Sequence, residues 1–325
     1  MSSIYSELKK YIEENGKMPK NTVVPLADHS DIEERYRDSW VPGSFEADIL
    51  RSFYDFKPKT VQCFMLSRAV QKQIVKPCDK NRDNMVKKLS KYYAISYADP
   101  VLSFLTKSVY KADMRIEALR MIKESEKREI VKFGIALLGY SGTKDDVDVL
   151  KFIAQHDEFT LFAVRALENI VPKEDYDSLM VEIAESTSGG FGKVAAIFEI
   201  SASPADNVRE WLLEKGAAVS CGEEYVACEC AVKGCLVYKL HEIAGLERED
   251  KNSFIGKYKD GICAVLNGLL KAEDTKNLDG LSEVDGILGA VVKLKEITAD
   301  SDYADDVELN ETFKKFEKYD RFMNN

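Results

Sequence analysis

The feature that most constrains the fold of this chain is a short pattern that recurs between residues 127 and 214. Phe133, Phe162 and Phe191 follow one another at a constant interval of 29 residues. A small residue comes directly after each ring and another apolar residue three positions later, giving the pairs Gly134 and Leu137, Ala163 and Ala166, and Gly192 and Ala195. At helical spacing, each segment then carries an apolar stripe that one helix pair cannot bury alone. The pattern predicts an all-α chain whose helix pairs stack on their neighbours.

The intervening segments repeat as well. Asp146, Val147, Asp148 and Leu150 align with Asp175, Tyr176, Asp177 and Leu179, and a looser fourth copy holds Val226, Ala227, Cys230 and Ala231. Helix pairs of about thirty residues, turns at residues 139–142 and Pro172, and acidic starts at Asp145 and Glu174 together resemble the HEAT-repeat family. The resemblance covers roughly residues 111–243. It implies an α-solenoid, a superhelix of stacked antiparallel helix pairs.

The chain changes character on both sides of these repeats. Pro19, Pro25, Pro42 and Gly43 break the N-terminal part into short pieces, with helices predicted over residues 31–40 and after Ser44. We interpret residues 1–56 as an irregular helical cap over the first helix pair, with a specific binding lobe as the alternative. Residues 57–243 form the predicted repeats, and residues 244–325 the C-terminal helices that complete the solenoid.

Two local patterns predict helix positions between the cap and the repeats. Asp99 is a suitable N-cap and Pro100 suits a first helical position, so a helix is predicted to begin there. In the next helical segment, Ile116, Leu119 and Ile122 have the spacing of a stripe that faces the core.

Composition limits the compartment and the class of protein. The chain has 325 residues, is 45% hydrophobic and carries a formal net charge of −10. No apolar run approaches the roughly 18 residues that span a bilayer, and the N-terminus lacks the apolar core of a signal peptide. We therefore expect a cytoplasmic protein with no membrane partner, whose seven cysteines are reduced thiols.

The most repetitive polar feature is a set of acids at the start of the second helices. These residues, which we call the acidic ridge, are Asp145, Asp146, Asp148, Glu174, Asp175 and Asp177. Acids in the first turn of a helix are stabilised by its N-terminal partial charge, which is sufficient to explain them. Stacked in adjacent repeats, they would also form a negative surface for a basic partner.

The stretch from Lys57 to Lys91 has the opposite charge, with ten basic residues and only Asp79 and Asp83 against them. Its candidate anion-binding residues are Arg68, Lys72, Lys76, Lys87, Lys88 and Lys91. Residues four apart share a helix face, so the first three would lie on one face and the last three on the next. This stretch is either a solvated surface or a site that binds phosphate.

Histidine and cysteine offer little chemistry. His29, His156 and His241 are far apart in the sequence, and His156 is predicted to follow a helix, where a cation would favour the dipole. Zinc takes thiolate and imidazole ligands, which makes candidate ligands of Cys221, Cys228, Cys230, Cys235 and His241. Cys228 and Cys230 would point apart on one helix, and Cys230 occupies a column of small buried residues, so the sequence favours packing over metal binding.

No Gly-rich phosphate loop, nucleophile elbow or zinc-protease motif occurs, and no cofactor is expected. HEAT-like deoxyhypusine hydroxylases bind iron through several His-Glu pairs, whereas this chain has only His241-Glu242. HEAT-like alkylpurine DNA glycosylases use a basic surface with aromatic residues, a role that Trp40, Trp211 and the basic stretch would fill, but no catalytic residue can be transferred.

Solenoids present extended concave surfaces, and an acidic one suits a basic partner. We therefore predict a non-catalytic scaffold that binds a basic protein, for example an immunity protein that neutralises a cationic nuclease toxin. The alternative is a nucleic-acid-binding protein of the alkylpurine DNA glycosylase kind.

Overall fold

The computed structural model describes residues 2–20, 22–32, 37, 40–46, 59–274 and 284–317. All secondary structure within these ranges is helical, which confirms the predicted all-α class. No helix within them is both long enough and apolar enough to cross a membrane. Two compact units divide between Glu199 and Ile200, and the predicted boundaries at residues 56 and 243 stay predictions.

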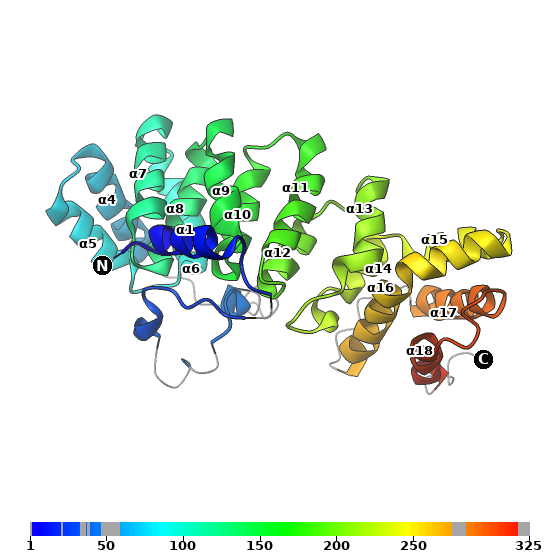
Figure 1. Cartoon of the computed structure of the whole chain (residues 1–325). Helices are drawn as coiled ribbons and strands as arrows, with labels where there is room; N and C mark the ends of the chain where they lie inside the picture. The colour runs from blue at the N-terminus through cyan, green and yellow to red at the C-terminus, as the bar shows by residue number, and fades with distance from the viewer. Residues whose placement is uncertain are drawn as a thin grey trace. The chain divides into compact units, whose positions relative to one another are not determined.

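Unit 1 begins with α1 and a short 3-10 turn and continues as a series of helices (Figure 1). Their bounds are α1 (Ile4–Asn15), η1 (His29–Asp31), α4 (Thr60–Val75), α5 (Asp79–Leu89), α6 (Ala94–Leu105), α7 (Lys111–Glu124), α8 (Arg128–Ser141), η2 (Lys144–Asp146), α9 (Val147–Ala154), α10 (Asp157–Glu168), α11 (Lys173–Ser186) and α12 (Phe191–Glu199). Two further helices were predicted, over residues 31–40 and after Ser44. Most residues of both segments lie outside the described residues.

The repeated aromatic residues lie on three helices that contact one another in turn. Phe133 is on α8, Phe162 on α10 and Phe191 on α12, and all three rings are buried. Helix α8 packs against α6, α7 and α10, while α10 packs against α9 and α12. Small residues allow these close approaches, because a Cβ added to Gly139 of α8 would lie 2.7 Å from the Cα atom of Ala166 in α10.

Two predictions from the helical pattern were wrong. Asp99 and Pro100 do not start a helix but lie inside α6, where Pro100 is tolerated within a continuous helix. Extended Tyr93 precedes the helix, and the buried faces of Ala94, Tyr97 and Val101 fix its earlier start. Packing of this stripe outweighs the local start signal.

Ile116 is exposed rather than part of the core stripe of α7. Met114, Ala118, Met121 and Ile122 are the residues that face inward, and their spacing defines a helix face from which Ile116 points away.

Unit 2 is also helical in its described residues. Its elements are α13 (Asp206–Trp211), a π-helical turn η3 (Leu212–Gly216), η4 (Glu223–Tyr225), α14 (Ala227–Lys233), α15 (Leu236–Ala244), α16 (Arg248–Asp274), α17 (Val284–Ala299) and α18 (Val307–Glu317). The long helix α16 contacts η3, η4, α14 and α18. Gly261 permits this packing, because an added Cβ there would lie only 2.1 Å from the carbonyl oxygen of Leu213.

Candidate functional site

A groove of about 510 Å³ lies over α6, α8 and α10 in unit 1. Its lining is Ile95, Ala98, Asp99, Leu102, Lys111, Ala136, Gly139, Tyr140, Gly142, Leu161, Phe162, Arg165, Ala166 and Asn169. Buried apolar residues form the floor, among them Ala98, Phe162 and Ala166. The last two belong to the repeated pattern, so the residues that let α8 and α10 approach also shape the groove.

The rim of the groove is polar and aromatic. Asp99, Lys111, Arg165 and Asn169 are exposed there, and Tyr140 presents an exposed ring. The ammonium of Lys111 lies 4.6 Å from the centroid of this ring, a distance that suits a cation–π contact. An apolar floor with a few polar groups at its edge is the usual composition of a binding groove.

The structure separates the members of the acidic ridge. Asp145, Asp148, Glu174 and Asp175 are exposed, in η2 and the first turns of α9 and α11. These turns follow the ends of α8 and α10 that line the groove, and a Cβ on the groove residue Gly142 would lie 3.2 Å from Asp146 Oδ2. None of these acids lines the groove, and Asp148 lines a separate pocket with Lys151 and Glu182. The exposed acids follow the groove-lining helices α8 and α10 in the sequence.

Asp146 has a structural role instead. Its carboxylate is 2% exposed and accepts hydrogen bonds from Arg115 Nε at 2.6 Å, Arg115 Nη2 at 2.7 Å and the backbone N–H of Thr143 at 2.8 Å. Burial alone would raise the pKa of Asp146, but the bonds from Arg115 and Thr143 hold it below its ordinary value. Asp177 is half-buried and is engaged in an interaction of its own.

The candidate anion-binding residues lie on α4, α5 and the residues just after them. Arg68 and Lys72 are exposed on α4, with Lys76 as its C-cap; Lys87 and Lys88 are on α5, and Lys91 follows it. Lys57 lies outside the described residues. Arg68 donates a hydrogen bond to Gln71 at 2.5 Å, and none of Lys72, Lys76, Lys87, Lys88 or Lys91 forms an ion pair with another described residue.

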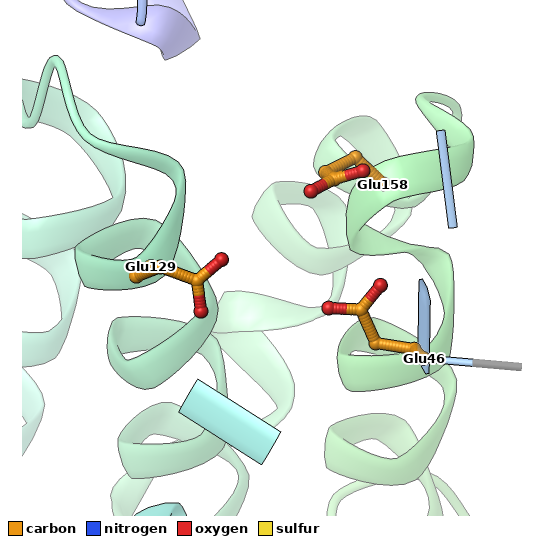
Figure 2. A group of neighbouring side chains, drawn as sticks. All are labelled: Glu46, Glu129 and Glu158. Carbon is orange, nitrogen blue, oxygen red and sulfur yellow. The ribbon is translucent and has the colours of Figure 1, made fainter. Parts of the chain in front are cut away.

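A buried ionic cluster, which the sequence did not reveal, holds the N-terminal segment against α8 and α10. We define it as Asp28, Glu46, Arg128, Glu129, Lys132 and Glu158. The ammonium of Lys132 is at its centre, 2.5 Å from Glu46, 2.7 Å from Glu158 and 3.1 Å from Glu129. Figure 2 shows the three carboxylates pointing toward the space between them. Lys132 is only 1% exposed.

Local structure explains how these side chains are placed. Asp28 caps the start of α8, since its carboxylate accepts from the Arg128 backbone N–H at 2.8 Å and from the Arg128 guanidinium at 2.9 Å. Glu158, in the first turn of α10, accepts from the N–H of Gly43 at 3.1 Å. Gly43 has a positive φ of 76°, and a Cβ there would lie 2.6 Å from the carbonyl oxygen of Asp157. This junction therefore favours glycine.

The cluster contains four carboxylates and two cations, and the environment adjusts their protonation. Burial raises the pKa of Glu46 to about 7, although Lys132 opposes this shift. Burial alone would lower the pKa of Lys132, but Glu129, Glu158 and Glu46 hold it well above its ordinary value. Oε2 of Glu46 is buried and has no hydrogen-bond partner among the described residues. The pKa of Glu46 therefore lies near neutral pH.

Glu46, Glu129 and Glu158 are also the residues with metal-ligand geometry, since oxygens from all three lie within 4.8 Å of one another. Their separation is explained by the Lys132 ammonium that they surround, so Lys132 supplies the cation of this site. We interpret the cluster as a structural anchor.

His156 corrects an expectation from the sequence. As predicted, it follows a helix, since only Gln155 separates it from the end of α9, but it is the buried N-cap of α10 and not a cation. Burial lowers its pKa. Nδ1 accepts from the backbone N–H of Glu158 at 3.3 Å and Nε2 lies 2.9 Å from the carbonyl oxygen of Val24, which indicates a neutral ring with its proton on Nε2.

The cysteines of unit 2 do not come together with His241 as a group of three or more potential metal ligands in the described part of the chain. Cys230 is buried, and a Cβ added to Gly216 would lie 2.7 Å from its sulfur. This close packing agrees with the small-residue column of the repeat.

A single sequence signal pointed to the ionic cluster: Lys132 is a charged residue inside the apolar run IVKFGIALLG. Its partners could not be identified, because Glu46 is 86 residues away and Glu158 belongs to another helix.

No family model, no curated protein and no solved structure matches this chain.

Proposed function

We propose that unit 1 is a HEAT-like α-solenoid that binds a segment of a partner protein in the groove over α6, α8 and α10. The observation that carries this proposal is the groove itself, with its apolar floor and polar rim. The solenoid is supported by the contacts of α10 with α8 and with α12, because each of these three helices carries one of the repeated aromatic residues.

The dimensions and chemistry of the groove suit side chains of a peptide or helix. A volume of about 510 Å³ falls in the range of about 300–1,000 Å³ that is common for binding pockets. Tyr140 is exposed on the rim, and tyrosine is among the residues that most often dominate the energy of protein interfaces. The bound partner segment would bury apolar side chains against Ala136 and Phe162, and its polar groups would form hydrogen bonds with the polar residues of the rim.

Charge favours a basic partner. The exposed members of the acidic ridge, Asp145, Asp148, Glu174 and Asp175, follow the helix ends that line the groove, and the chain carries −10 overall. Such a surface accelerates encounter with a cationic protein and makes it sensitive to salt. We therefore propose that the protein is a non-catalytic scaffold, and specifically that it inhibits a cationic toxin by binding it.

The experiment is affinity capture from the source cells with the wild type and two tryptophan variants. Ala136→Trp would fill the groove from a half-buried position, whereas Ala202→Trp adds the same bulk at an exposed site in unit 2. We expect a basic protein that binds the wild type and Ala202→Trp, is lost with Ala136→Trp, and dissociates as salt rises. An acidic partner bound equally by all three proteins contradicts the proposal.

Nucleic-acid binding is the second candidate, favoured by the exposure of Arg68, Lys72 and Lys76 without ion pairs to other described residues. Its test is a labelled duplex at about 50 mM salt, where phosphate contacts are strongest. Binding that disappears when all three residues become Glu supports this candidate, and no binding by the wild type eliminates it.

A further inference from the structure

The outer face of α4 exposes apolar residues as well as cations. Val61 is 70% exposed, Phe64 50%, Met65 55% and Val75 61%. Together with Arg68 and Lys72 they recur at intervals of three and four residues, which places them on one side of the helix. We call this surface the α4 stripe. It is a continuous mixed face and not a row of lysines alone.

The core of unit 1 does not require these apolar residues. The opposite side of α4 is buried through Cys63, Leu66, Val70 and Ile74, and the helix packs against α5, α6 and α7. Phe64 does touch Phe104, with ring centroids 5.6 Å apart, yet half of its surface is still exposed. Four large apolar side chains that are at least half exposed on one short helix are more typical of an interaction surface than of scattered exposure.

The charge on the stripe has one sign. Helix α4 contains no Asp or Glu, while Arg68 and Lys72 follow the apolar residues Phe64 and Met65. Arg68 is bonded only to the neutral side chain of Gln71 among its described contacts. A ligand for this surface must therefore cover apolar side chains and supply negative charge beside them.

These requirements distinguish between macromolecules. Duplex phosphates would pair with Arg68 and Lys72 but would leave Val61, Met65 and Val75 in contact with a polar backbone. An amphipathic helix buries one apolar stripe against another and carries acids on its flanks. We infer that the α4 stripe binds an acidic amphipathic helix of another protein. None of its residues lines the groove over α6, α8 and α10.

The probe is a synthetic helical peptide as long as α4, with leucine on one face and glutamate on its flanks, and its binding to the full chain is measured by fluorescence anisotropy. Val61→Ser/Met65→Ser removes apolar contact at exposed positions, and Arg68→Glu/Lys72→Glu reverses the charge. We expect each double variant to weaken binding about tenfold or more. Lys144→Glu/Lys173→Glu, which alters exposed cations of η2 and α11, should leave the affinity within about twofold.

A charge-swap control separates recognition from misfolding. The Arg68→Glu/Lys72→Glu chain should bind a version of the peptide with lysine in place of glutamate, a gain that a damaged fold would not produce. A short DNA duplex and anionic lipid vesicles are tested in parallel. The inference is overturned if α4 variants do not change peptide binding, or if duplex or vesicle binding depends on Arg68 and Lys72 but not on Val61 and Met65.

Discussion

The ionic cluster around Lys132 and the α4 stripe use the same kinds of residue in opposite ways. Lys132 is 1% exposed and contacts three carboxylates, whereas Lys72 is exposed on a helix without any acid. Burial makes the first charge dependent on its partners, since a buried ion without compensation is very costly. Exposure leaves the second charge available for a ligand. Position on the helix, and not residue type, separates the buried, paired charge from the exposed charge in this chain.

Removing the central cation should have the largest effect. Lys132→Met leaves the carboxylates of Glu46, Glu129 and Glu158 together in a buried site, so we expect the free energy of unfolding to fall by about 3–5 kcal/mol in urea denaturation. Lys151→Met is the matched control, because Lys151 pairs with Glu182 at 2.6 Å in a partly exposed position. Its loss should cost less than about 1 kcal/mol. Equal effects would remove the contrast between buried and exposed charge.

Glu46 should give the cluster a pH dependence. Its pKa is raised from 4.5 to about 7, so the folded chain keeps a proton that the unfolded chain has lost over that range. Stability from this group is therefore complete below about pH 4.5 and decreases as pH rises to about 7, by an amount on the order of 3 kcal/mol. Glu46→Gln keeps the neutral form, and the difference between wild type and variant should follow this course. A constant difference from pH 4.5 to 8 contradicts the assignment.

Within the acidic ridge, Asp146 should behave like the cluster and Asp145 like the surface. Asp146→Ala removes the two bonds from Arg115 and the cap on Thr143, at a cost of about 1–3 kcal/mol. Asp145→Ala affects an exposed carboxylate and should change the unfolding free energy by less than about 0.5 kcal/mol. Thermal unfolding of the two variants side by side measures this difference.

The smallest effect on stability per residue is expected from the exposed acids. Asp145→Asn, Asp148→Asn, Glu174→Gln and Asp175→Asn combined should lower the unfolding free energy by about 1–2 kcal/mol, because each exposed acid in a first helical turn contributes only a few tenths of a kcal/mol. The same variant should associate more slowly with a basic partner, and stopped-flow kinetics at low salt would detect it. An unchanged association rate would limit the role of the ridge to helix stabilisation.

The sequence predicted the helix contacts that follow the 29-residue repeat, although the helical period assigned Ile116 to the wrong face of α7. The aromatic residues at 133, 162 and 191 lie on helices that contact in turn, as their spacing indicated. Features that depend on contact between distant segments were not predictable in this way. Asp28 and Glu46 approach α8 only in the folded chain, and nothing in their local sequence identifies Arg128 or Lys132 as partners.

The groove lies between these cases. Ala166 was recognisable as a small residue of the repeat, but Gly139 was predicted to begin a turn, and this was wrong because α8 continues to Ser141. The direct contact of Gly139 with Ala166 in the lining of the groove required the structure. Likewise, the sequence identified the cations of α4, while the exposure of Phe64 and Met65 beside them depended on which face packs inward. A helical period gives the faces of a helix but not the neighbour that each face meets.

The most direct test of partner binding in the groove is site-specific photocross-linking. A benzophenone amino acid is placed at Tyr140 on the groove rim or at Tyr238, an exposed tyrosine of unit 2. We expect the captured partner to cross-link from position 140 and not from position 238, and Ala136→Trp to abolish the adduct. A partner that cross-links from position 238 alone, or equally well from position 140 after Ala136→Trp, would contradict binding in the groove.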